Sequence, residues 1–126
     1  MLRRIVQALM LKARERKGSP PWIAFTSEGF ELRKAESLVG GVEWSEIRKI
    51  VAFKRDLVTT DAVCLEFHLV GRDGVFEVND DVGGFWELVG RVKEVFPGSD
   101  QDWEATVVRP AFARNARVIF EAPWCA

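Results

Sequence analysis

The chain has 126 residues, of which 48% are hydrophobic, and its 18 basic side chains nearly balance 19 acidic ones to give a formal net charge of −1. A chain of this length is typical of one domain and buries roughly two thirds of its unfolded surface, so it can fold without a metal or disulfide framework. This composition excludes a disordered or collagen-like chain.

The charge is divided unevenly along the chain. Residues 1–17 carry six basic side chains and one acidic one, a net of +5, so the remainder carries −6. Apolar residues in this segment recur at steps of three and four, which predicts an amphipathic helix over residues 1–17 that ends at the glycine and prolines of residues 18–21. The apolar stripe consists of Leu2, Ile5, Val6, Leu9 and Ala13, and the basic side chains are Arg3, Arg4, Lys12, Arg14, Arg16 and Lys17.

The first residues predict neither a membrane-spanning segment nor a secretory signal. Their longest apolar run, residues 5–11, is far shorter than the roughly 20 residues of a spanning helix. Basic side chains follow this run at once, where a signal peptide would have small residues. Cys64 and Cys125 are the only cysteines, too few for a disulfide framework. We therefore expect a cytoplasmic protein.

Residues 22–33 alternate between apolar and polar positions. Ile23 and Phe25 lie on one face, a turn is expected at residues 27–29, and Phe30 and Leu32 continue the alternation, which predicts a hairpin. Gly40 and Gly41 are expected to break the next stretch. Residues 42–56 then form a strand that is apolar on both faces around Ile50 to Phe53, as is typical of a central strand.

Residues 63–79 contain the clearest alternation. Val63, Leu65, Phe67 and Leu69 face one way, and Cys64, Glu66 and His68 face the other. A turn at residues 71–74 leads to a second strand, residues 75–79. A four-residue loop would oppose Leu69 to Phe76, His68 to Glu77, Phe67 to Val78 and Glu66 to Asn79.

A helix is expected at about residues 81–96, capped by Asn79, Asp80 or Asp81 and ended by Pro97 and Gly98. Its apolar stripe is predicted to be Val82, Phe85, Trp86, Val89, Val92 and Phe96. In the tail, residues 103–109 alternate like a strand, residues 111–116 suit one helical turn, and residues 117–121 are strand-like. The whole pattern predicts an α+β fold: a strongly bent antiparallel sheet or partly open barrel over residues 22–126, closed by one amphipathic helix, with the N-terminal helix of residues 1–17 as a separate element.

Motifs for catalysis, metals and nucleotides are weak. One histidine and two distant cysteines supply no zinc site, and the glycine pairs lack the spacing of a phosphate loop, so we expect no cofactor or metal. The strongest catalytic hypothesis places Cys64 near His68, Glu66 and Glu77, but four residues along one strand separate the thiol from the imidazole by roughly 13 Å. A solvated cross-strand pair of His68 and Glu77 is the alternative. Nucleic-acid binding is not expected, because the body is acidic.

A charged strand end and turn, residues 53–61, is the candidate binding surface if the domain binds a ligand, although charged turns are also common as solvated loops. The candidate residues of this surface are Lys54, Arg55, Asp56, Thr59, Thr60 and Asp61, with Arg114 and Asn115.

The runs VEWSEIRKIVAFKRD, VCLEFHLVGRDGVFEV and GGFWELVGRV resemble the small bacterial pleckstrin-homology-like domains over about residues 22–96. The segments FKRDLVTTDAVCLEF and PAFARNARVIFE are also similar to those of a family of short uncharacterised proteobacterial proteins. The resemblance implies a seven-stranded barrel, of which only about five strands are expected before the helix. It also implies a binding module, because such folds bind lipids, peptides and proteins.

We therefore expect a non-catalytic binding or adaptor protein whose partner is another protein or a second copy. One alternative is attachment to an anionic membrane through the basic side chains of residues 1–17, since each contributes on the order of 1 kcal/mol near such a surface. That segment could equally pack on its own domain, on a second copy or on a partner. The other alternative is a domain that neutralises a toxin.

Overall fold

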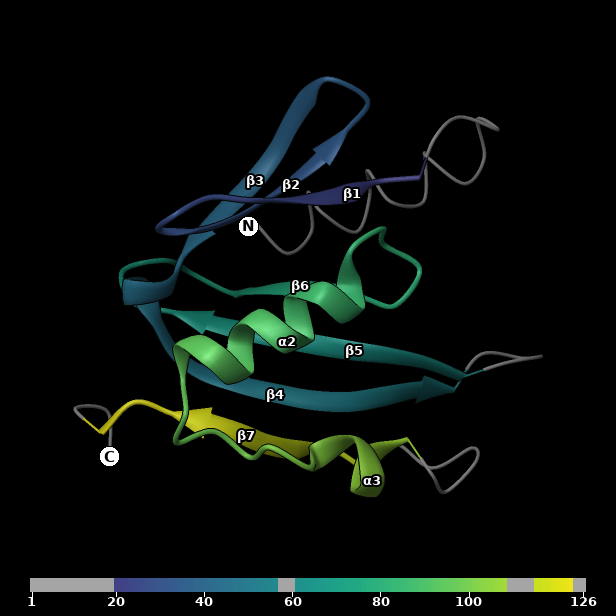
Figure 1. Cartoon of the computed structure of the whole chain (residues 1–126), viewed down its shortest axis with the longest axis vertical. Helices are drawn as coiled ribbons and strands as arrows, with labels where there is room; N and C mark the ends of the chain where they lie inside the picture. Colours follow the sequence, from purple (N-terminus) through teal and green to yellow (C-terminus); the bar gives the residue numbers. More distant parts are fainter. Residues whose placement is uncertain (1–19, 57–60, 109–114, 124–126) are drawn as a thin grey trace.

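The computed structural model describes residues 20–56, 61–108 and 115–123, and within them seven strands form two antiparallel sheets (Figure 1). The first sheet has the order β1-β2-β3, with β1 at Trp22–Phe25, β2 at Gly29–Lys34 and β3 at Ser37–Glu43. The second has the order β6-β5-β4-β7, with β4 at Ile47–Asp56, β5 at Asp61–Leu69, β6 at Val75–Asn79 and β7 at Arg117–Glu121. The α+β class is confirmed, but these described strands do not close into one barrel. The predicted helix of residues 1–17 lies outside the described residues.

The first hairpin is confirmed. Ile23 pairs with Leu32 and Phe25 with Phe30, so the apolar positions of both strands share a face. The hydroxyl of Thr26 accepts a hydrogen bond from the backbone N–H of Gly29, which tightens the turn. A side chain on Gly29 would meet the carbonyl oxygen of Val42 at 1.9 Å, so the close approach of β3 requires glycine there.

The expected break at Gly40 and Gly41 is wrong, because both residues lie inside β3. The chain instead bends at a short 3-10 turn, Trp44–Glu46, which divides the predicted single strand of residues 42–56 between the two sheets. The carboxylate of Glu46 accepts a hydrogen bond from the N–H of Glu43 at 2.8 Å and bonds Arg72 at 2.7 Å. These side-chain hydrogen bonds stabilise the bend together with a backbone hydrogen bond from the N–H of Trp44 to the carbonyl oxygen of Glu28 at 2.8 Å.

The predicted hairpin of β5 and β6 exists with a different register. Phe67 opposes Phe76, His68 opposes Val75 and Glu66 opposes Glu77. The connection is two residues longer than the predicted four, which moves each partner by two positions. Because side chains alternate with a period of two, a shift of two leaves every side chain on its predicted face.

The helix after β6, α2 (Phe85–Val95), is shorter than predicted and begins at Gly84 rather than at an aspartate cap. Gly84 has φ +87°, a left-handed conformation that glycine adopts without strain. The buried face contains Phe85, Leu88, Val89 and Val92. Trp86 is 51% exposed, so its predicted place in the core is wrong. One residue beyond Phe85, its side chain lies about 100° around the helix.

Residues 103–107 form a short helix, α3 (Trp103–Val107), not the predicted strand. Trp103, the first residue of this helix, is only 1% exposed. The strand predicted at residues 117–121 is confirmed as β7, which pairs with β4 and makes β4 central, as expected.

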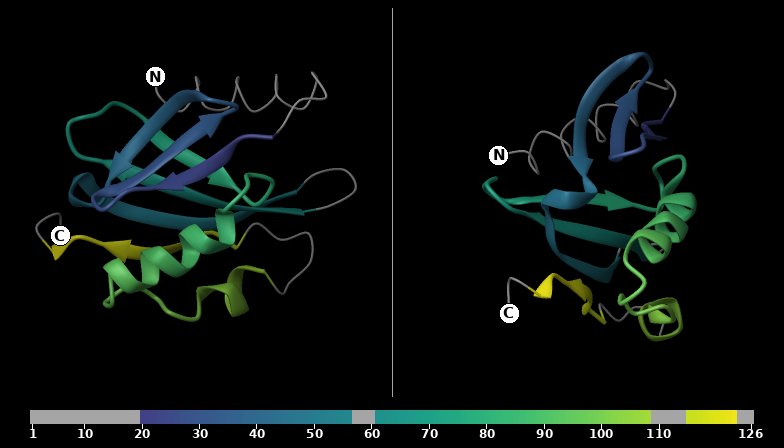
Figure 2. Two further views of the ribbon diagram at one scale, coloured as in Figure 1. Left: turned by 45° about the horizontal axis from the view of Figure 1, so that its top comes forward. Right: turned by 60° about the vertical axis from the view of Figure 1, so that its left-hand side comes forward.

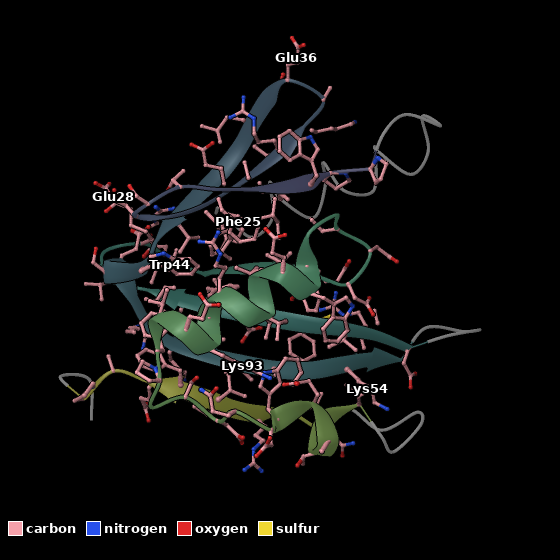
Figure 3. All side chains as sticks on the ribbon, in the orientation of Figure 1. Phe25, Glu28, Glu36, Trp44, Lys54 and Lys93 are labelled. Atoms are coloured by element: carbon pink, nitrogen blue, oxygen red, sulfur yellow. The ribbon has the colours of Figure 1, made fainter. Side chains whose placement is uncertain are left out.

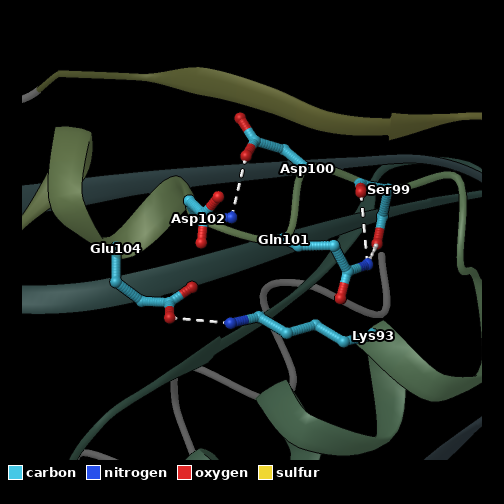
Figure 4. A network of polar contacts seen from close by, with 6 residues as sticks. All are labelled: Lys93, Ser99, Asp100, Gln101, Asp102 and Glu104. Atoms are coloured by element: carbon cyan, nitrogen blue, oxygen red, sulfur yellow. Dashed lines mark hydrogen bonds and ion pairs between the residues drawn. The ribbon is translucent and has the colours of Figure 1, made fainter.

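Polar contacts hold the connection between α2 and α3 (Figure 4). Lys93 Nζ lies 2.7 Å from Glu104 Oε2, which joins the two helices. Asp100 accepts a hydrogen bond from the N–H of Asp102 at 3.0 Å. The hydrogen bond from Arg117 of β7 to the other oxygen of Asp100 lowers the pKa of that carboxyl. These contacts position α3 against α2 and β7.

The main core lies between the two sheets and under the helices. Phe30 of the first sheet packs on Phe67 and Phe76 of the second, with ring centroids 5.2 and 5.9 Å apart. Figure 2 shows α2 and α3 on the same side of the four-stranded sheet. We call the face under these helices the inner face and the opposite one the outer face.

Candidate binding surface

The structure divides the predicted binding residues of the β4–β5 turn between the two faces of the sheet. Lys54 lies at the end of β4 beside α3 (Figure 3) and is only 3% exposed. Its ammonium group lies 3.2 Å from Asp61 Oδ2 and donates to the carbonyl oxygen of Val108 at 3.2 Å. Lys54 and Asp61 therefore compensate each other's charge beside α3 and do not form an exposed binding pair.

Arg55 points to the outer face, where it forms a two-fold contact with Glu77 of β6. Its two terminal nitrogens lie 3.0 and 2.9 Å from the two carboxylate oxygens. Burial alone would lower the pKa of Arg55, but the hydrogen bond and charge of Glu77 raise it above its ordinary value. Glu77 is 3% exposed, and the guanidinium of Arg55 also lies 5.5 Å from the centre of the Phe53 ring, so the pair covers part of the outer face of the sheet.

The other predicted members of this surface are not brought together in the described parts of the chain. Asp56 ends β4, but its side chain is outside the description, as are Thr59, Thr60 and Arg114. Asn115 has φ +48° and precedes β7. Its side-chain nitrogen is buried without a hydrogen-bond partner among the described residues.

The catalytic hypothesis for Cys64 and His68 finds no support in the geometry. Burial is the largest cause that raises the pKa of the Cys64 thiol to about 12, and the charge of Glu77 adds to it. A thiol of that pKa is protonated at neutral pH and is a poor nucleophile. Its sulfur donates to the carbonyl oxygen of Ala62 at 3.7 Å. Cys64 therefore packs as a small apolar side chain.

His68 pairs with Glu66 on its own strand, and the predicted cross-strand pair with Glu77 is wrong. His68 Nε2 lies 2.9 Å from Glu66 Oε1. Burial, the largest cause, lowers the pKa of His68, although Glu66 opposes that effect. The lowered pKa favours the neutral imidazole, for which the contact with Glu66 is a hydrogen bond rather than an ion pair.

Two tryptophans that the sequence did not indicate as binding residues are the main exposed aromatic residues of the described chain. Trp22 is 40% exposed at the start of β1, and Trp86 is 51% exposed in the first turn of α2. The two elements are neighbours: the N–H of Ile23 donates to the carbonyl oxygen of Gly83 at 2.8 Å, three residues before Trp86. The spacing of Phe85, Leu88, Val89 and Val92 could have revealed Trp86, because that stripe is complete without it.

β1 and α2 also contact each other through an aromatic ring and a cation. Phe25 is half-buried between the two elements (Figure 3), and the guanidinium of Arg91 lies 5.1 Å from the centre of its ring. Phe25 and Arg91 join the two elements, whereas the indole N–H of Trp22 donates to the carbonyl oxygen of Ala35 at 3.4 Å, just after β2. We call Trp22, Phe25, Trp86 and Arg91, the aromatic and cationic side chains of these two neighbouring elements, the β1–α2 surface. Tryptophan and arginine are enriched among the residues that contribute most to protein interfaces.

The described residues show neither a metal site nor a membrane-spanning helix. They contain no group of three or more histidine, cysteine, aspartate or glutamate side chains arranged to hold a metal ion. None of their helices is long and apolar enough to cross a membrane. Comparison with protein-family models, with curated proteins and with solved structures found no match.

Proposed function

We propose that this protein is a non-catalytic binding module that engages a protein partner through the β1–α2 surface. The observation that carries the proposal is the exposure of Trp22 and Trp86, 40% and 51%, on two neighbouring elements. A partner that covers the exposed indoles lowers the free energy of the system by roughly 25 cal/mol per Å² of apolar area removed from water. Arg91 adds a cation to this aromatic surface, which is the composition of an interface centre.

The test compares two exposed positions in a pull-down from the native host. Trp86→Ser removes an exposed indole from the β1–α2 surface, while Val118→Ser is the matched control, because Val118 is equally exposed at 51% but lies on β7. We expect a stoichiometric partner to be captured by the wild type and by Val118→Ser, and at least tenfold less by Trp86→Ser. Equal capture by both variants would contradict the proposal.

The molecular mass of the purified protein in solution shows whether the partner is a second copy of this chain or a different protein. Sedimentation equilibrium of the purified chain shows whether a second copy is the partner, and Trp86→Ser should then shift the dimer toward the monomer. A monomer at all concentrations directs the search to a different protein. A cytoplasmic location belongs to the same proposal and is checked by fractionation of host cells.

Attachment to an anionic membrane is the second candidate. It is favoured by the position of Trp22, which follows the basic segment of residues 1–17 after only four residues, since tryptophan favours the membrane interface. Sedimentation with anionic and neutral vesicles tests it. Binding that ignores lipid charge, or that survives deletion of residues 1–17, would exclude attachment through the basic segment.

A pleckstrin-homology-like relationship remains a proposal. It is supported by the seven strands that the described residues form in two antiparallel sheets and by a helix over the inner face of the four-stranded sheet. The order of elements departs from the expected pattern, because β7 follows α2. A solved structure of a relative with clear sequence similarity would test it, and a different strand order there would contradict it.

A further inference from the structure

Gly90 lies in the middle of α2, where the described fold does not require glycine. A Cβ on Gly90 would meet no atom of another element within 4 Å, and the backbone there is helical. The two glycines before α2 differ: Gly84 has φ +87°, and a Cβ on Gly83 would lie 3.3 Å from the Cβ of Trp22. Because glycine in a helix interior is less favourable than alanine, Gly90 lowers the stability of α2 without a packing reason in the described chain.

Gly90 is exposed, and it follows the exposed Trp86 by one helical turn. Residues four apart lie on the same side of a helix, and their separation along the axis is about 6 Å. The side of α2 that is turned away from the sheet therefore presents a large indole next to a position without a side chain. Glycine allows the backbone of a second element to approach closely.

These two positions complement each other in a second copy of the chain. When two identical helices pack antiparallel about a two-fold axis, residues at equal distances before and after the axis face each other. An axis at the level of Leu88, midway between the two positions, places Trp86 of each copy opposite Gly90 of the other. The same contact then forms twice, as a two-fold symmetric interface requires.

The charges of α2 fit the same arrangement. Glu87 and Arg91 are exposed and each follows one member of the Trp86 and Gly90 pair, so both lie about 100° further around the helix on the same flank. The two-fold axis brings Glu87 of each copy near Arg91 of the other, and the two carboxylates and two guanidinium groups sum to zero charge. Opposite charges across an interface favour the correct partner and register.

We propose that α2 is a dimer contact, in which the helices of two copies pack antiparallel and the Trp86 indole of each copy covers Gly90 of the other. This inference rests on the proposed function, because it names a second copy of the chain as the partner of the β1–α2 surface. It also gives Gly90 a role, since any side chain there would keep the indole of the other copy away from the helix.

Sedimentation equilibrium of the full chain tests the contact at Gly90. Gly90→Gln adds a side chain that favours a helix, so it should obstruct the indole of the other copy without destabilising the monomer. The matched control is Gly98→Gln, because a Cβ on Gly98 also meets no atom within 4 Å but Gly98 lies beyond the end of α2.

We expect the wild type and Gly98→Gln to dimerise with the same dissociation constant and Gly90→Gln to weaken the dimer at least tenfold. At a concentration where all three proteins are monomeric, the Tm of Gly90→Gln should be no lower than that of the wild type, which separates loss of contact from unfolding. Equal dimerisation of the wild type and Gly90→Gln would overturn the proposal, as would equal weakening by Gly98→Gln.

Exchange of the two positions tests the antiparallel geometry. Trp86→Ala removes the indole and Gly90→Trp places an indole one turn later, so each change alone should weaken the dimer. In the double variant the indole of each copy again faces a small residue of the other, and most of the lost affinity should return. A double variant as weak as the weaker single variant would overturn the antiparallel contact.

The measurements also separate this inference from the proposed function. A wild-type chain that is monomeric at every concentration overturns the dimer. If Trp86→Ser still reduces the capture of a different protein, the β1–α2 surface remains the binding surface and only the identity of the partner was wrong. A monomeric wild type whose capture of partners does not depend on Trp86 would contradict both proposals.

Discussion

Two tryptophans in neighbouring helices give opposite expectations for stability. Trp103 is 1% exposed and is the largest fully buried side chain of the described residues, whereas Trp86 is 51% exposed. Each is replaced by alanine, so the same atoms are removed from two different environments. The difference in unfolding free energy therefore measures burial and not the chemistry of the side chain.

The expected magnitudes follow from the two environments. Trp103→Ala removes a buried aromatic side chain and leaves a cavity, which costs about 3–5 kcal/mol. Trp86→Ala leaves no closed cavity and removes about 100 Å² of buried apolar area, which corresponds to about 1–2 kcal/mol after allowance for burial in the unfolded chain. The edge-to-face contact of Trp86 with Phe85, at 5.1 Å between ring centroids, is included in that loss.

Urea unfolding followed by far-ultraviolet circular dichroism measures both variants, because that signal does not depend on the number of tryptophans. Trp103→Ala should also lower Tm by about 10–20 °C in a domain of this size. A loss for Trp86→Ala equal to or larger than that for Trp103→Ala would refute the assignment of the buried face of α2 and the burial of α3.

Three further outcomes are expected. Gly29→Ala should lower stability strongly, because a Cβ there would lie 1.9 Å from the carbonyl oxygen of Val42. Gly90→Ala should instead raise stability by about 0.5–1 kcal/mol, because a Cβ on this residue of α2 would meet no atom of another element within 4 Å. Thermal melts of both variants check this, and the opposite order would contradict the packing of β2 on β3. The single histidine should titrate below 6.5 in proton NMR, because burial lowers the pKa of His68, and a value above 6.5 would show that the contact with Glu66 outweighs the effect of burial. Since the unfolded chain then binds the proton more readily, the wild type should lose stability relative to His68→Gln as the pH falls from 6.5 through the folded pKa, and a constant difference between the two urea midpoints would count against the lowered pKa.

Local pattern predicted the strands and their faces because the alternation of side chains is a property of the extended backbone. Ile23 and Leu32 share a face, as do Leu65 and Phe67, and the β5–β6 pairing keeps these faces even though its register differs by two residues. The length of the connecting loop was not fixed by alternation, since any even shift satisfies the same pattern. The amphipathic helix was also predicted. Its pattern did not show that Trp86, next to the buried stripe, is exposed.

The failures arise where a contact from a distant part of the chain decides the local structure. Gly40 and Gly41 lie in a strand because β2 pairs with them, and residues 103–107 form a helix that buries Trp103 although their sequence alternates. Lys54 was predicted at a binding surface, yet Asp61 and the carbonyl oxygen of Val108, 54 residues away, compensate its charge and allow its burial.

The sequence by itself determined the class of the fold, the faces of its strands and the separation of a basic segment of +5 from a body of −6. Only the tertiary structure decided which polar and aromatic side chains are available. Arg55 is paired with Glu77, while Trp22 and Trp86 are exposed. The physical reason is that charge and periodicity are local properties, whereas the exposure of a side chain depends on which elements pack around it.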